Sequence, residues 1–232
     1  MADVPLGGAG RKIIARLLAL VVEPRRRDER PPSCALCHAP AWWNGWRVVH
    51  SVVATSTARV VERREVTLAR GKCSSCLVGF TCYPPGIYPG RQYQLDVVAD
   101  VVAAVTLGGE PVEHAAAICS ASATSVRRWT AWVAALASAG ELHAAAARLD
   151  ASTATVASTC LTSPHRPASA VLMALEVLGA ALVRVGVTVV ERTGLGRVLG
   201  WQHRCHGDVY GLVTGPTKFS PAMVPGGRPA TR

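Results

Sequence analysis

Apolar residues follow two patterns along the chain: runs rich in valine and threonine come first, and residues at helical spacing follow. The segments Trp46–Val53 and Arg59–Leu68 are rich in valine and threonine, with the polar stretch Ala54–Thr57 between them. This pattern predicts two antiparallel strands that form a hairpin. The earlier apolar segment Arg11–Val22 fits either a short helix or a strand, and its sequence leaves both open.

Helical spacing begins after Tyr83–Arg91, where prolines and glycines interrupt regular structure. Between Gln92 and Val105, apolar residues recur three or four positions apart, which predicts an amphipathic helix. Three further helices are expected, because Pro111 and Ser122 can begin two of them and an Ala-rich run follows. Their predicted ranges are Val112–Cys119, Ser122 to about Leu136, and Glu141–Leu149.

The most apolar stretch, Ala168–Val190, is long enough to raise the question of a membrane span. Glu176 and Arg184 lie within it, and each charge costs roughly 2.5–3.5 kcal/mol near a bilayer centre. We therefore expect a buried helix and no membrane partner. Ser152–Pro167 is expected to be a polar connector, and the Gly- and Pro-rich end after Gly215 a frayed tail.

The charge of the chain favours a polyanionic partner. The 232 residues carry a net charge of +10, with a pI near 9.7. Residues 1–90 contain 13 basic and 6 acidic residues, residues 91–150 contain 4 and 6, and residues 151–232 contain 8 and 3. Because lysine and arginine release counterions from phosphate, nucleic acid is the first candidate and acidic lipid the second. The basic field belongs to the N-terminal and C-terminal segments.

Four of the eight cysteines form two Cys-x-x-Cys pairs, Cys34/Cys37 and Cys73/Cys76. Two such pairs supply the four tetrahedral ligands of a structural Zn²⁺ site and leave no open position for a catalytic water. The intervening 35 residues exceed the common spacing of about 15–20, and the predicted hairpin accounts for the excess. The alternative without a metal is four reduced cysteines in the core.

A second interpretation comes from His38, which completes a Cys-x-x-Cys-His pattern of covalent haem attachment. That interpretation leaves the second cysteine pair unexplained and requires export. The apolar stretch before Arg25 is interrupted by Arg16 and leads to no small-residue cleavage site. We therefore expect a cytoplasmic, nucleoid-associated protein. Lone residues are not assigned as ligands. Cys82 is a conceivable spare ligand for the four-cysteine cluster, and a second site is conceivable from Cys160, His165, His203, Cys205 and His206.

The segment Ala116–Trp129 (AAICSASATSVRRW) resembles the helix-turn-helix of transposases and bacterial regulators. Ser120 stands where that motif usually has glycine, at a left-handed position that strains other residues. Val126, Trp129 and Val133 are spaced to pack inward. The expected DNA-contacting residues on the outward side are Ser122, Ala123, Thr124, Arg127, Arg128 and Ala131. An ordinary helical hairpin with a solvated arginine pair is the plainer alternative.

The order of the two motifs, from Cys34 to Trp132, is similar to the N-terminal region of insertion-sequence transposases and of small bacterial proteins that share it. The resemblance implies binding of double-stranded DNA at element ends, without cleavage. In those transposases, catalysis comes from a following domain with three separated carboxylates that bind metal ions. After Asp150 the chain has only Glu176, Glu191 and Asp208 as acidic residues, so no nuclease domain is expected.

The predicted fold class is therefore α+β, with a small β zinc ribbon, a mainly α-helical helix-turn-helix domain and a C-terminal apolar helix. The expected divisions are 1–33, 34–90, 91–150 and 151–232. We expect a zinc-stabilised DNA-binding protein, transposase-related or regulator-like, that is not an enzyme and takes no small-molecule substrate. The alternative is a zinc-ribbon interaction module that uses the C-terminal helix for a homodimer or another partner.

Overall fold

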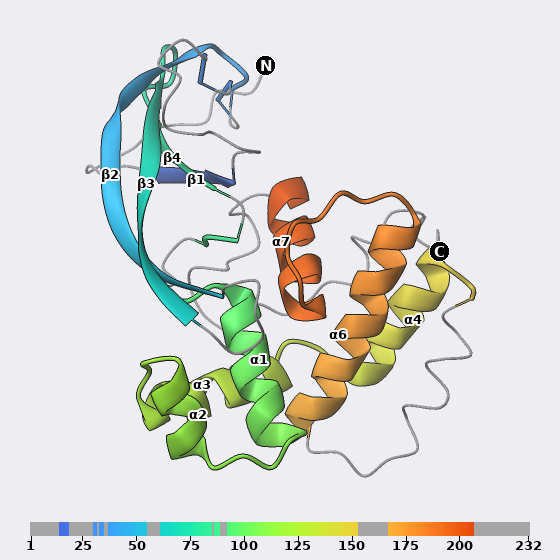
Figure 1. Cartoon of the computed structure of the whole chain (residues 1–232). Coiled ribbons are helices and arrows are strands. Elements are labelled where there is room, and N and C mark those ends of the chain that lie inside the picture. Colours follow the sequence, from blue (N-terminus) through green and yellow to red (C-terminus); the bar gives the residue numbers. More distant parts are fainter. Residues whose placement is uncertain are drawn as a thin grey trace, which may run out of the picture.

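The structure is a computed structural model. It describes residues 14–18, 30–31, 33–34, 37–54, 61–84, 86–88, 92–152 and 167–206. Apart from its two ends, the predicted connector Ser152–Pro167 lies outside the described residues, as does the tail after Gly215. The chain has an α+β architecture in which a small sheet is followed by helices (Figure 1). This much of the predicted fold class is confirmed.

The sheet is built around a long hairpin of β2 (Ala41–Ala54) and β3 (Val61–Cys73). The two strands pair antiparallel from Ala41 opposite Cys73 to Ala54 opposite Val61, which confirms the predicted hairpin and lengthens it. β4 (Gly79–Tyr83) pairs antiparallel with β3, and β1 (Ile14–Leu18) pairs parallel with β4. The ambiguous N-terminal segment therefore contributes a strand, and β4 is a strand that its short sequence did not predict.

Each face of the sheet carries its own apolar cluster, because side chains alternate along a strand. Val53, Leu68 and Ile87 form one cluster, and Ala69, Phe80 and Cys82 form the other. The ring of Phe80 lies over Gly71, where an added Cβ would meet it at 2.2 Å. A bulge between Trp43 and Trp46, with Gly45 at φ 96°, interrupts the register.

Four helices follow the sheet in the predicted order: α1 (Leu95–Thr106), α2 (Val112–Ile118), α3 (Ala123–Ala134) and α4 (Ala139–Leu149). The Ser122 side chain caps α3 by accepting a hydrogen bond from the Ser125 N–H. Ser138 and Glu141 form a reciprocal capping box at the start of α4. This cap explains why α4 begins two residues before the predicted Glu141.

The apolar C-terminal stretch forms α6 (Pro167–Arg184), which packs against α4, α7, α3 and α1. Its length and composition would allow it to cross a membrane, but 56% of it is buried inside the chain. The helix ends six residues before the predicted Val190. Gly186 has φ 84°, and the Val187 N–H donates to the carbonyl of Leu182, so the backbone turns away there.

A further helix, α7 (Gly194–His206), was not predicted and lies between the sheet and α6 in Figure 1. Three glycines make it a weak helix by sequence. Its start is held by carboxylates from other helices: Asp96 accepts hydrogen bonds from Arg192 and Thr193, and Glu176 accepts one from the Gly194 N–H. Tertiary contacts at its positive end therefore help to stabilise α7.

One hydrophobic core joins α1, α2, α3, α4, α6 and α7. The sheet is attached to this core through the end of β2, where Val52 exchanges backbone hydrogen bonds with Gln92 and Gln94 at 2.7 and 3.0 Å. The intervening residue, Tyr93, forms an isolated bridge to Val52. The cysteine end of the hairpin lies at the opposite end of β2 from this attachment.

Candidate functional site

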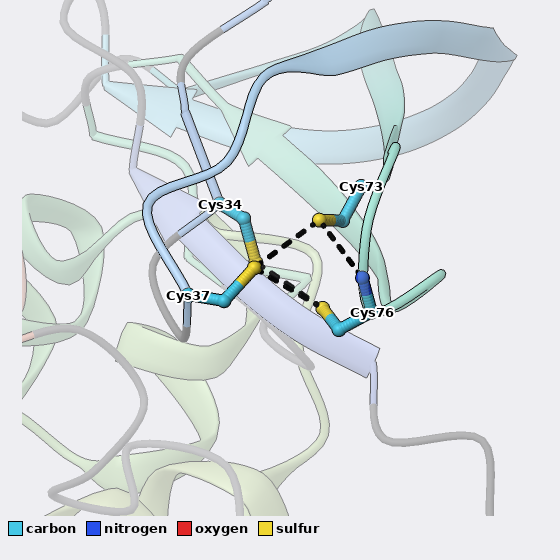
Figure 2. Close-up of side chains that lie close together, drawn as sticks. All are labelled: Cys34, Cys37, Cys73 and Cys76. Atoms are coloured by element: carbon cyan, nitrogen blue, oxygen red, sulfur yellow. Dashed lines mark hydrogen bonds between the residues drawn. The ribbon is translucent and has the colours of Figure 1, made fainter. Parts of the chain in front are cut away.

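The four predicted zinc ligands come together at the far end of the hairpin. Cys34 and Cys37 precede β2, while Cys73 ends β3 and Cys76 lies in the turn that follows it. Their sulfurs point toward one another (Figure 2). The Sγ atoms are 3.6 Å apart between Cys34 and Cys76, 3.4 Å between Cys37 and Cys73, and 3.7 Å between Cys37 and Cys76. All four lie within 4.8 Å of one another.

These separations fit a metal ion better than a disulfide. A disulfide places its sulfurs about 2.05 Å apart, and all four cysteines are free thiols. A tetrahedron with metal–sulfur bonds of about 2.3 Å has edges of about 3.8 Å, close to the observed distances. The cluster can therefore hold a tetrahedral ion with little movement of its side chains.

The two cysteine turns share two backbone features among their described residues. The Cys34 N–H donates to the carbonyl of Ala39, and the Cys73 N–H donates to the carbonyl of Val78, five residues on in each case and 3.0 Å away. The residue after the second cysteine is left-handed in both turns, His38 at φ 58° and Leu77 at φ 59°. Such a conformation strains a residue with a side chain, so its occurrence twice indicates that both turns are shaped to aim their sulfurs.

Hydrogen bonds orient the second turn and tie it to the first. The N–H groups of Ser75 and Cys76 donate to the Cys73 sulfur at 3.3 and 3.4 Å. The backbone and hydroxyl of Ser74 both donate to the carbonyl of Pro40, at 3.0 and 2.7 Å. Donors of this kind orient a ligand and stabilise its negative charge around a metal.

The thiols of Cys73 and Cys76 differ in their acidity. Burial raises the pKa of Cys73, but the N–H groups of Ser75 and Cys76 and the neighbouring thiols outweigh it and lower the pKa to about 6. At Cys76 the Val78 N–H lowers the pKa, but desolvation and the other sulfurs raise it to about 12. Cys73 is therefore a stronger acid than Cys76, and a metal cation must displace the proton that Cys76 keeps.

Cys82 and Cys119, the two further cysteines whose side chains the structure describes, do not extend this cluster. Cys82 is buried opposite Ala69 in the sheet, where desolvation raises the pKa of its thiol to about 11. Cys119 is buried at the end of α2, and its thiol donates to helix carbonyls. Cys160 and His165 lie outside the described residues, as do the side chains of His203, Cys205 and His206.

The predicted DNA-contacting residues gather on α3. Val126, Trp129 and Val133 are buried against the core. Five of the six predicted contacts are exposed and Ala123 is half-buried, the exposed five being Ser122, Thr124, Arg127, Arg128 and Ala131. The division into inward and outward positions expected from the spacing is thus present in the helix.

Not all of these side chains are free to reach a ligand. The Ser122 hydroxyl caps α3 and lies 2.9 Å from that of Ser125. Arg127 forms an ion pair with Glu113 of α2 at 2.6 Å, a partner that the sequence did not reveal. Arg128 has no ion pair with any described residue. It is therefore the most available cation of this surface.

The turn between α2 and α3 is held from outside by Tyr93. Ser120 is left-handed at φ 54°, as expected for the position it occupies. The Tyr93 hydroxyl donates to the Ser120 carbonyl at 3.0 Å, and its ring packs edge-on against Trp129 with centroids 4.8 Å apart. Tyr93 thus links the attachment point of the sheet to the orientation of α3.

Comparison of the chain with protein-family models, with curated proteins and with solved structures finds no match. The four-sulfur cluster and the exposed face of α3 are therefore the features of the chain that bear on its function.

Proposed function

We propose that the chain is a zinc-stabilised DNA-binding protein, transposase-related or regulator-like, without a catalytic domain of its own. Cys34, Cys37, Cys73 and Cys76 bind one structural Zn²⁺, and α2 and α3 act as a helix-turn-helix. Double-stranded DNA is the ligand, with α3 in its major groove.

The α2–α3 pair is the observation that carries this proposal. A short helix, a four-residue turn with a left-handed second residue and a capped second helix follow one another between Val112 and Ala134. The outward side of α3 combines Arg127 and Arg128 with short side chains, which allow a close approach to base edges. The inward side of α3 is packed in the hydrophobic core, so α3 can present its outward residues to DNA without a change in its own position.

Arg128 is assigned as the principal contact, to a guanine edge or a phosphate. Thr124 and Ala131 lie on the same exposed side of α3 and would contact the groove wall or a thymine methyl group. Arg127 would exchange its pairing with Glu113 for a phosphate. Ser122 would contribute through its cap, which orients the first turn of the helix.

Glu176 and Glu191, the two acidic residues after Asp150 that the structure describes, support the assignment as a binding protein. Glu176 accepts a hydrogen bond from the Gly194 N–H at 2.6 Å, and Glu191 is buried and accepts one from the Tyr88 hydroxyl at 2.7 Å. Both carboxylates thus hold α7 in place. Because both carboxylates are engaged in these hydrogen bonds, a structural role for Glu176 and Glu191 is favoured over metal-dependent strand cleavage.

The interaction module gains no comparable support. Its partner surface was expected on the apolar helix, and ten residues of α6 are already buried against the same chain. An interaction module would bind DNA weakly and with little salt dependence. A phosphate-binding protein loses affinity steeply as salt rises, so a salt titration distinguishes the two.

The decisive experiment combines metal analysis with a double variant. Purified protein should contain one zinc and no haem per chain. Replacing Arg127 and Arg128 with alanine should abolish sequence preference in duplex binding at fixed salt, with a cost of about 1–3 kcal/mol per lost base contact. Arg64→Ala, which removes an exposed arginine paired with Glu62 in β3, serves as the control. Unchanged DNA binding by the double variant would show that α3 is not the recognition helix.

A further inference from the structure

The cysteine end of the sheet has two chemically different faces. Paired residues of an antiparallel sheet share a face, so the register assigns each side chain to a side. One face carries Trp43 and Phe80 in an apolar cluster, with Trp46 stacked on Trp43 at 5.6 Å and Val48 exposed. Among the described residues of β2, β3 and β4 at this end, no charged side chain lies on that face.

The opposite face, here called the basic face, gathers the charge and consists of Trp42, Arg47, Arg70 and Lys72. Trp42 pairs with Lys72, and Arg47 pairs with Leu68. Arg70 lies on β3 between Leu68 and Lys72 and points to the same face. Arg47 and Arg70 are exposed, Lys72 is half-buried, and Trp42 is 42% exposed. No described residue on this part of the face is acidic.

The neighbouring strand keeps this surface open. Gly79 pairs with Lys72 and Thr81 pairs with Arg70 in β4, so the residues beside the two cations are small. Farther toward the helices the same face is covered by the cluster of Val53, Leu68 and Ile87. The exposed indole and three cations therefore form a bounded platform next to the metal cluster.

We infer that the basic face binds single-stranded DNA, with an unpaired base stacked on Trp42 and phosphates held by Arg47, Arg70 and Lys72. An exposed aromatic ring among cations suits a strand whose base faces are free, because stacking and phosphate contacts then act together. A duplex hides its base faces within the helix and can use only the cations. This inference adds a second surface to the proposed function and does not depend on α3.

The four-cysteine cluster keeps this platform assembled. Lys72 directly precedes Cys73, and Trp42 lies two residues after Pro40, whose carbonyl accepts both hydrogen bonds from Ser74. A metal that joins the two turns therefore holds Trp42 and Lys72 opposite each other. Removing it should weaken single-strand binding in the intact chain.

The test measures binding of the zinc-loaded full chain to a fluorescein-labelled dT oligomer of about 15 nucleotides and, separately, to a duplex. Trp42→Ala should weaken oligomer binding about tenfold or more, and Trp42→Phe should restore most of it. Trp46→Ala is the matched control, since Trp46 is 38% exposed on the other face, and it should change neither affinity. Zinc content and thermal melting verify that each variant is folded.

A charge series provides the second readout. Arg70→Gln should lower the salt slope of oligomer binding by about 0.7, whereas Arg63→Gln, an exposed arginine of the same strand on the opposite face, should leave it unchanged. Arg128→Ala should weaken duplex binding alone, so a failure of the proposed recognition helix is seen separately. Equal losses for Trp42→Ala and Trp46→Ala, or no loss for either, would overturn the inference. A tenfold preference for an rU oligomer would overturn the assignment to DNA.

Discussion

Glu113 neutralises one of the two arginines that α3 presents to solvent. Both side chains of the Glu113–Arg127 pair are more than half exposed, so the pair itself contributes little to stability. Its effect on a polyanion is larger, because the carboxylate both occupies a cation and repels phosphate.

Glu113→Gln should therefore tighten duplex binding severalfold and steepen its salt dependence by about 0.9 per released arginine. Fluorescence anisotropy at several salt concentrations measures both quantities. Glu110→Gln is a suitable control, because this carboxylate lies three residues before Glu113 and pairs with His114 instead. Weaker binding by the Glu113 variant would show that the carboxylate positions Arg127 and does not compete for it.

His143 makes stability depend on pH from within α4. It is buried, desolvation lowers its pKa, and its Nδ1 has no hydrogen-bond partner among the described residues. Its pKa is then lower in the folded than in the unfolded chain, so below the unfolded value of about 6.5 the unfolded state binds more protons. The free energy of unfolding falls as the pH drops from about 6.5 toward the folded pKa.

Urea unfolding measured at a series of pH values should show this loss in the natural chain and a smaller one in His143→Leu. Above about pH 7.5 the histidine is neutral in both states, so its contribution to the pH dependence should vanish there. An undiminished loss below pH 6.5 in the leucine variant would assign the effect to other groups.

At the scale of elements, the α2–α3 turn holds strain at Ser120. A left-handed conformation costs a residue with a Cβ about 1–2 kcal/mol. Glycine avoids this strain, but it loses more backbone entropy on folding, which offsets part of the gain. Ser120→Gly should raise the free energy of unfolding by about 0.5–1 kcal/mol, as measured by chemical denaturation. Ala121→Gly, next to it but without a positive φ, should lower it. A loss of stability in the Ser120 variant would mean that its side chain stabilises the turn.

The elements that local sequence specifies were predictable, and those held by distant residues were not. The β2–β3 hairpin follows from its β-branched residues, and the start of α3 follows from the cap at Ser122. β4 has five residues and is defined by its pairing with β3. α7 contains three glycines, and its start depends on Asp96 and Glu176, which are far away in sequence.

The same division holds for the candidate site. The spacing of the cysteines predicted which four would meet, because each Cys-x-x-Cys turn brings two sulfurs together locally. The pairing of Arg127 with Glu113 depends on how α2 packs on α3, which spacing does not specify. The basic face could not be predicted from the sequence either. The bulge between Trp43 and Trp46 shifts the register of β2, and this shift decides which residues of β2 lie on the same face of the sheet.

At the scale of the whole molecule, stability is divided unequally between the two ends. The helices share one extensive core, whereas the sheet has two small clusters of three buried residues each. Metal binding is therefore expected to contribute to the folding of the cysteine end and little to that of the helices.

Chelation, or Cys37→Ser, should abolish zinc binding and lower the thermal stability of the hairpin while most helical circular dichroism at 25 °C persists. Cys82→Ala is the matched control, because it removes a buried thiol outside the cluster and should retain one zinc per chain. Simultaneous loss of the helices on chelation would show that the metal supports the entire core.

The length of β2 has a consequence for how DNA would be phased under the proposed function. Ten residue steps separate Trp42 from Val52, which is at most about 33 Å along the strand and close to one turn of B-form DNA at about 34–36 Å. Val52 lies beside Tyr93, which holds the turn before α3. A duplex that α3 binds and that runs along β2 would reach the basic face about ten base pairs away, and shifting a duplex–overhang junction by about five base pairs would then turn the unpaired strand to the wrong side.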